Sequence, residues 1–414
     1  MRGKKINGKK EVNILFYYII CIIVSMVSFK SFIFIKNNKL EGEEFLGIDS
    51  KKNEKLKERL IKIKGKEGFN KGYFQGIDIF RINNEDVLIL SEEDNNYKEL
   101  GTYTSEEIET EDFTNLILTW NSKTPENTYI EVLARAYIVE RDDVVGRWSE
   151  YLSWGLWGTT INSSSKNSEC EIAKIDTDVF VVRDKENNVG KKIQIKVNLY
   201  SSDLKSTPKL NQLTATFIDN NKAKEVLIDN TEKIYYNKVL ETPCFSQYER
   251  EESIAARICS PTSLTMVLNR MGEKLIVEDV AWNCYDYKYD GFGNWAFNVA
   301  FAGSLGYEAY IEYGSLEVLE REISKGYPVV VSVKYTNDIN NKEYPYIENS
   351  PLTTSGHLIV VCGIEVNNSN EVYIVVNDPA GKNNESVRRK YKLNEFLISW
   401  SKSNNAMYIV NKKY

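Results

Sequence analysis

Three segments that lie far apart along this 414-residue chain carry side chains that could act together in acyl transfer. Cys259 opens a predicted helix, His357 begins a strand-like run, and Asp378 directly follows the next such run. His357 is the only histidine, and histidine is the side chain whose unperturbed pKa lies near neutrality. A thiol, an imidazole and a carboxylate in this arrangement are typical of a nucleophile, its base and the group that orients the base. We therefore expect cleavage or transfer of an amide bond through a thiolate.

Each of the three residues also has an ordinary structural interpretation. A lone cysteine is usually a buried core residue, a histidine in a strand is usually packed with its hydrogen bonds satisfied, and Asp-Pro is a common turn. Cys259 differs because free backbone N–H groups and the dipole at the start of a helix favour its thiolate. If strands His357–Val366 and Val372–Asn377 pair in antiparallel fashion, Asp378 falls beside His357, where it would orient the imidazole.

Gln247 is a candidate for the stabilisation of a tetrahedral intermediate. It lies twelve residues before Cys259, and its side-chain amide together with the Cys259 backbone N–H would form an oxyanion hole. The spacing of the six cysteines matches no zinc pattern, so we expect no metal and no cofactor. A disulfide between Cys244 and Cys259 would remove the free thiol that the proposed mechanism needs, and we regard this pairing as the less favoured alternative.

Length and charge limit the classes of function. A chain of this length favours two domains and a tail. The 53 basic and 59 acidic residues are well mixed and give a net charge of −6. Nucleic-acid binding usually needs a basic face or tail, so we expect no nucleic-acid partner.

The first 36 residues have the pattern of a membrane signal. Five basic residues precede the apolar run Ile14–Phe29, and a second apolar stretch ends at Ile35. A basic front followed by an apolar core is typical of a secretory signal or an uncleaved signal anchor. We favour an anchor that leaves everything after Lys36 outside the cytoplasm, and a cleaved signal peptide is the alternative. Residues 37–71, rich in Lys and Glu, are predicted to form a solvated stalk.

Residues 72–222 predict an antiparallel β-sandwich, because short alternating runs recur between turns. Trp148, Trp154 and Trp157 lie close together and could form a platform for a glycan, although burial in the core is the commoner fate of such clusters. The expected strands are Asp86–Leu90, Asn115–Trp120, Tyr129–Ile138, Asp178–Arg183, Lys192–Leu199 and Leu213–Phe217.

Residues 240–414 predict helices followed by an antiparallel sheet, so the fold class is α+β. The expected helices are Cys259–Met271, Val277–Cys284, Trp295–Leu305 and Leu316–Lys325. The expected strands are Pro328–Tyr335, His357–Val366, Val372–Asn377 and Ala406–Asn411.

With these residues assembled, the stretch from about Pro243 to Asn411 resembles the family-39-like cysteine peptidases, relatives of the bacteriocin-leader-processing peptidases in the papain clan. The resemblance implies a papain-like fold, Cys259 as nucleophile, His357 as base, Asp378 as orienting group and Gln247 as oxyanion donor. The preceding β-rich half looks like the sandwich found before such peptidase domains in secreted proteins. The matching stretches are Gln247, Cys259-Ser260-Pro261-Thr262-Ser263 with Met266, Gly293-Asn294-Trp295, Gly356 to Gly363, and Asn377-Asp378-Pro379.

One departure from the leader-processing relatives concerns location. Those relatives are fused to transporters and work inside the cell, whereas this chain has no ATPase motif and an outward-facing signal. We therefore do not extend to this chain the cleavage after a double-glycine leader that those relatives perform. We expect an extracytoplasmic peptidase that acts on peptides, proteins or cell-wall peptides. Peptidoglycan amidase or transpeptidase-type chemistry, and an inert cell-surface protein that binds glycan, remain alternatives.

Overall fold

The computed structural model describes residues 59–222 and 237–412, all within one compact unit that runs from Glu54 to Tyr414. The predicted signal anchor and most of the predicted stalk lie outside the described residues. Within the described ranges, no helix combines the length and apolar character needed to cross a bilayer.

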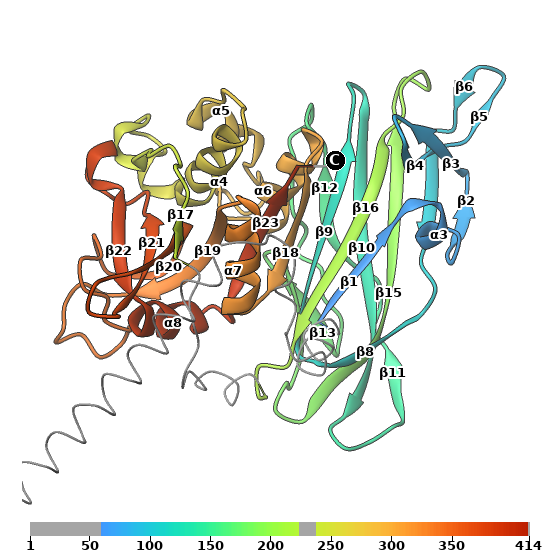
Figure 1. Ribbon diagram of the computed structural model, residues 1–414. Helices are drawn as coiled ribbons and strands as arrows, with labels where there is room; N and C mark the ends of the chain where they lie inside the picture. Colours follow the sequence, from blue (N-terminus) through green and yellow to red (C-terminus); the bar gives the residue numbers. More distant parts are fainter. Residues whose placement is uncertain (1–58, 223–236, 413–414) are drawn as a thin grey trace, which may run out of the picture. The chain divides into compact units, whose positions relative to one another are not determined.

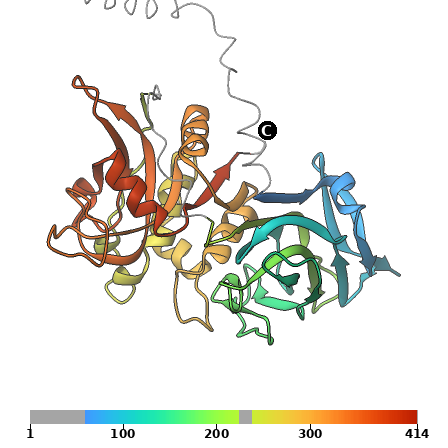
Figure 2. The ribbon, with the colours of Figure 1, turned by 90° about the horizontal axis from the view of Figure 1, so that it is seen from below.

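Two seven-stranded antiparallel sheets make up the amino-terminal half (Figure 1). Residues that point to one face of each sheet share a common core. Figure 2 shows the two sheets facing each other. The first sheet has the order β13-β14-β9-β16-β4-β3, with β1 also paired to β16. Its strands are β13 (Ala173–Asp176), β14 (Val179–Val182), β9 (Asn115–Lys123), β16 (Lys209–Ile218), β4 (Glu85–Leu90), β3 (Ile77–Ile82) and β1 (Leu60–Lys64).

The second sheet has the order β11-β10-β15-β7-β2, with β12 paired to β10 and β8 to β15. Its longest strand shows the expected alternation, because Ile130, Val132 and Ala134 are buried and the residues between them are partly exposed. The strands are β11 (Gly146–Trp148), β10 (Thr128–Glu140), β15 (Asn188–Ser201), β7 (Leu100–Thr104), β2 (Tyr73–Gln75), β12 (Leu152–Trp157) and β8 (Ile108–Phe113). A short hairpin, β5 (Glu92–Glu93) with β6 (Asn96–Tyr97), stands apart from both sheets.

The end of the predicted stalk belongs to the sandwich. Residues 60–64 form β1, which pairs with β16 over five residues, and Gly65–Phe69 form the short helix α3. The sequence LIKIK alternates with period two, and Ile63 is buried while Lys64 is exposed. The assignment of residues 60–69 to a solvated stalk was therefore wrong, because the lysines concealed a strand pattern.

The tryptophan cluster is mainly core. Trp154 and Trp157 are each 1% exposed, and the Nε1 of Trp154 donates to the backbone oxygen of Asp178. Trp148 is only half-buried, and it packs against Tyr137 and under the guanidinium of Arg135. Burial of two of the three rings rules out a three-tryptophan glycan platform and confirms the packing interpretation for those two.

The carboxy-terminal half is built on a third antiparallel sheet with the order β18-β23-β19-β20-β21-β22, and β17 pairs with β20. Its strands are β18 (Glu308–Tyr313), β23 (Ala406–Asn411), β19 (Val329–Tyr335), β20 (Thr354–Val366), β21 (Val372–Asn377), β22 (Arg388–Lys392) and β17 (Lys238–Val239). The described residues are thus mostly antiparallel sheet with several helices, which is an α+β arrangement.

Helices cover both faces of this third sheet. Side chains of α4 (Cys259–Arg270), α5 (Val277–Asn283) and α6 (Trp295–Ser304) share one core with Leu358 and Val360 of β20. Side chains of α7 (Leu316–Lys325) and α8 (Leu393–Ser401) share the core on the other face with Ile359 and Val361. The alternation of β20 therefore separates the two cores, and α4 is placed over the strand that carries His357.

Candidate active site

Cys259 is the first residue of α4 and is half-buried. Its neighbour Ile258 provides no side-chain cap, so the first N–H groups of the helix are not occupied by a capping side chain. Pro261 suits the first turn because a proline has no N–H to leave unsatisfied. The thiol thus lies where the partial positive charge of a helix start favours an anion.

His357 lies near the start of β20, and its ring is buried between the other two candidate residues. Its Nε2 lies 2.8 Å from Oδ1 of Asp378, and the ring also forms a hydrogen bond with the Cys259 thiol. Since Nε2 is engaged by the carboxylate, the nitrogen available to sulfur is Nδ1. The structure therefore brings the thiol, imidazole and carboxylate into one continuous hydrogen-bonded series.

Strand pairing places Asp378 beside His357, as the sequence predicted. β20 and β21 are antiparallel, and Val360 stands opposite Asn377. Asp378 follows as the next residue of the chain and turns its carboxylate towards His357. An extra residue in β20 between Val361 and Gly363 leaves Cys362 unpaired at a bulge, and Cys362 is fully buried in the core on the α4 face.

Asp378 is fully buried and is held by more donors than His357 alone. The hydroxyl groups of Tyr335 and Tyr391 donate to Oδ2 over 2.6 and 2.8 Å, and the backbone N–H of Ala380 donates to Oδ1 over 2.9 Å. The ring of Tyr335 also meets the imidazole edge to face at 5.9 Å. These two tyrosines were not among the sequence-predicted site residues.

The charges of these groups shift their pKa values towards an ion pair. Burial acts to lower the pKa of His357, but the negative charges of Asp378 and Cys259 outweigh it and raise that pKa to about 10. Burial acts to raise the pKa of Cys259, but the charge and hydrogen bond of His357, with the N–H of Leu358, bring it below its usual value. Burial likewise opposes ionisation of Asp378, and the His357 charge and hydrogen bond, helped by both tyrosines, hold its pKa low. A thiolate facing an imidazolium is the favoured state.

Gln247 is buried next to this series, in a short 3-10 turn. Its backbone N–H donates to the oxygen of Pro379, the residue after Asp378. One N–H of its amide donates to the oxygen of Ala255 over 2.9 Å, and its Oε1 is buried without a partner. An amide nitrogen carries two N–H groups, so one remains for a substrate oxygen.

Among the described cysteines, Cys259 alone contacts the histidine. Cys244 and Cys259 are both free thiols, so they are not joined to each other. Burial raises the pKa of Cys284 above its usual value, and that of Cys362 to about 11. The Cys244 sulfur lies 3.7 Å from Oδ1 of Asn377.

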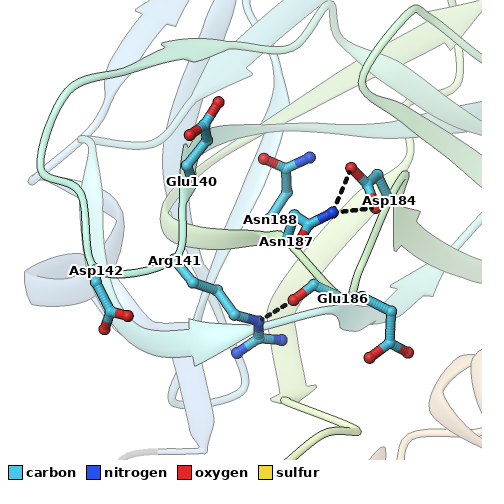
Figure 3. Close-up of a pocket in the computed structure, with 7 residues that line it drawn as sticks. All are labelled: Glu140, Arg141, Asp142, Asp184, Glu186, Asn187 and Asn188. Carbon is cyan, nitrogen blue, oxygen red and sulfur yellow. Dashed lines mark hydrogen bonds between the residues drawn. The ribbon is translucent and has the colours of Figure 1, made fainter.

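Figure 3 shows a polar hollow in the sandwich that involves none of these residues. Within this hollow the Nε of Arg141 donates to the backbone oxygen of Glu186, and the amide of Asn187 donates to Asp184. The Arg141 guanidinium also binds Asp219, which does not line the hollow. Over residues 59–222 and 237–412, no group of three or more potential ligands could hold a metal ion.

Comparison with known proteins gives two family matches. Residues 239–408 match the family model described as "Peptidase_C39 like family", and residues 63–217 match the one described as "Peptidase C39 N-terminal domain". No curated protein matches the chain.

Two solved structures show distant similarity. One is a double glycine motif protease from an AMS/PCAT transporter in complex with the leader peptide. It is 18% identical with a TM-score of 0.28, and the match covers 44% of this chain and 100% of that chain. The other is the CBM22-1–GH10 part of endo-1,4-beta-D-xylanase 10B from Clostridium thermocellum, complexed with xylohexaose. It is 13% identical with a TM-score of 0.17, and the match covers 44% of this chain and 28% of that chain.

Proposed function

Because residues 239–408 belong to the peptidase C39-like family and form a cysteine-type peptidase domain, we propose that Cys259, His357 and Asp378 are its catalytic residues. The observation that carries this proposal is the buried series in which Asp378 binds His357 and His357 binds the Cys259 thiol. A papain-like arrangement, with a helix presenting sulfur and a sheet presenting the base, is the interpretation that we favour for this half.

In the first step the Cys259 thiolate attacks the carbonyl carbon of the scissile peptide bond. Proton transfer from the imidazolium of His357 to the leaving nitrogen breaks the C–N bond and leaves a thioester on Cys259. Asp378 keeps Nε2 engaged, so the nitrogen that faces sulfur is the one that gives up its proton.

In the second step water attacks the thioester carbonyl. The neutral imidazole accepts a proton from this water, the C–S bond breaks, and the acid product leaves with the thiolate–imidazolium pair restored. Negative charge develops on the carbonyl oxygen in both steps. The backbone N–H of Cys259 and the second amide N–H of Gln247 are the donors that we assign to it.

The substrate class that we propose is a peptide or protein outside the cytoplasm, including peptides of the cell wall. The support for this location is the basic and apolar pattern of residues 1–36, which indicates a single-pass anchor. Mass spectrometry of the amino terminus of the mature protein tests it. An intact first residue supports the anchor, and a terminus beyond residue 36 would show a cleaved signal instead.

The catalytic assignment is tested by Cys259→Ala, with Cys170→Ala as the matched control. Cys170 is a half-buried free thiol of the sandwich, which makes no contact with the proposed site. Each variant is incubated with unfolded protein and with purified wall fragments, and products are weighed by mass spectrometry. We expect Cys259→Ala to release nothing while Cys170→Ala matches the wild type. Hydrolysis by Cys259→Ala at the wild-type rate would exclude the mechanism, and the product masses identify which amide bond is cut.

A further inference from the structure

Helix α6 is a structural part of both halves of the molecule. Its residues from Ala296 to Gly303 are all buried, and a helix with apolar residues on every side is expected only where it packs on more than one side. At Gly303 an added Cβ would lie 2.6 Å from Nδ2 and 2.9 Å from Cα of Asn121 on β9, so the helix meets the sandwich closely. Its residues in the sandwich core are Ala296, Phe297 and Ala300, and those in the peptidase core are Val299, Phe301 and Ala302.

The first turn of α6 is capped from the sandwich. Asp178, in the turn between β13 and β14, is 5% exposed, and its Oδ2 accepts the backbone N–H groups of Trp295 and Ala296. Asn294 caps the next N–H, because its Oδ1 accepts from Phe297 over 3.0 Å. The donors at the start of the helix are therefore shared between a residue of its own half and a carboxylate of the other.

The loop before α6 is attached to the sandwich as well. Oδ1 of Asp286 accepts the N–H of Ser165 over 2.9 Å, and Oδ2 accepts the amide of Asn294 over 2.8 Å. The N–H of Tyr287 donates to the oxygen of Ser163 over 3.0 Å. These contacts hold the loop as far as Asn294, whereas Asp178 binds the first N–H groups of the helix itself.

From the capped turn, direct contacts lead to the nucleophile. The ring of Trp295 meets that of Tyr408 at 6.5 Å and 67°. The hydroxyl of Tyr408, which is buried, lies 3.0 Å from Oγ of Ser260, the residue bonded to Cys259. Trp295 and Cys259 also pack against the same core. A shift of the α6 start would move Trp295 against Tyr408 and disturb the first turn of α4.

We propose that Asp178 is a positioning residue through which the sandwich fixes the start of α6 and, by way of Trp295, Tyr408 and Ser260, the nucleophile Cys259. This inference rests on the proposed catalytic function. In this proposal the sandwich is needed for catalysis because it positions the nucleophile, and it is not only a separate binding module. Misplacement of a reacting group by about 1 Å can lower a rate about a hundredfold, so small shifts of α4 suffice.

To cap α6, residue 178 needs a hydrogen-bond acceptor, and it does not need a negative charge. Burial, opposed by the two backbone hydrogen bonds, raises the pKa of Asp178 to about 7. A neutral side chain with the same oxygen, as in Asp178→Asn, therefore keeps the cap, whereas Asp178→Ala removes it.

The experiment compares four variants of the full chain. Asp178→Ala removes the cap, Asp178→Asn keeps its acceptor, and Tyr408→Phe breaks only the bond to Ser260. Thr216→Val is the matched control, because the Thr216 hydroxyl accepts the N–H of Tyr313 on β18 across the same interface and does not bind the capped start of α6. The measurements are kcat, KM and the rate at which iodoacetamide labels Cys259 at pH 6.

For Asp178→Ala and Tyr408→Phe we expect kcat and the labelling rate to fall by about tenfold to a hundredfold, with KM within about threefold of wild type. Asp178→Asn and Thr216→Val should stay within about threefold in all three measurements. Wild-type kcat and labelling in Tyr408→Phe, or an equal loss in Thr216→Val, would overturn the inference. An inactive Cys259→Ala together with a fully active Asp178→Ala would refute the positioning role and leave the catalytic assignment standing.

Discussion

Replacing His357 by glutamine removes the cation that faces the Cys259 thiol while keeping a donor for Asp378. In the wild type, burial and the Asp378 charge raise the pKa of Cys259, and His357 with the N–H of Leu358 lowers it by more. Without His357, burial and Asp378 are opposed by a single N–H. The pKa of the thiol then returns to about 8.5 or higher, the value of an ordinary cysteine.

The magnitude follows from the fraction of thiolate. A thiol of pKa about 8.5 is ionised in about one molecule in 300 at pH 6, so the loss of thiolate alone would slow alkylation about 300-fold. A thiolate of low pKa is intrinsically the weaker nucleophile, so part of this advantage is cancelled. We therefore expect His357→Gln to slow alkylation of Cys259 at pH 6 by about tenfold to a hundredfold, with the difference shrinking as the pH approaches 9.

The assay is iodoacetamide labelling followed by peptide mapping, with Cys244 as the internal control. Cys244 is also a half-buried free thiol, and it makes no contact with His357, so its labelling rate should be the same in both proteins. Equal labelling of Cys259 in wild type and His357→Gln at pH 6 would refute the ion pair. Parallel slowing of Cys244 would show instead that the substitution altered access to the whole region.

Three other predictions follow from the same geometry. Hydrolysis, measured as kcat/KM against pH, should fall as the pH rises through about 10, because the imidazolium of His357 then loses its proton; a constant rate to pH 11 would contradict this. Tyr391→Phe removes a 2.8 Å donor to Asp378 and should cost about 1.5–3 kcal/mol in urea unfolding. Since the pKa of Asp378 is lowered below 3.8 in the folded state, this difference should be present above about pH 4 and disappear as the pH falls below it; a difference that persists in acid would point to packing instead. Gln247→Ala should lower kcat about a hundredfold to a thousandfold with little change in KM, and an unchanged kcat would remove Gln247 from the oxyanion site.

The position of Asp378 could be predicted because it depends on a local rule. Two neighbouring strands joined by a short turn pair in antiparallel fashion, so the residue after the second strand returns to the start of the first. Helix α7 was predictable for a similar reason. Ser315 caps its start, and Gly326 adopts a φ of +95° just after its end, as the sequence rules for helix ends require.

The tyrosines that hold Asp378 could not be predicted in this way. Tyr335 ends β19 and Tyr391 lies in β22, a strand with the sequence RRKYK that no apolar alternation reveals. Both hydroxyl groups donate to Asp378 because the third sheet places the two strands beside the same carboxylate. Strand β18 was also missed, since its glutamates conceal it, and Glu308 forms ion pairs with Lys62 and Lys64 of β1.

The shared helix was only half predicted. The run from Trp295 to Leu305 was recognised as a helix, but its apolar residues on every side were a further signal that it contacts two cores. The predicted division into two separable domains concealed this second core, because composition changes along the chain while packing joins residues that lie far apart in it.

The engagement of both ring nitrogens of His357 also has a spectroscopic consequence. With one histidine in 414 residues, isotopic labelling of that amino acid alone gives an NMR spectrum in which every imidazole signal comes from the centre of the proposed site. The nitrogen frequencies distinguish a ring protonated at both positions from either neutral tautomer. Titration, inhibitor binding and each intermediate could then be followed at a single ring, without assigning any other resonance of this 47.7 kDa chain.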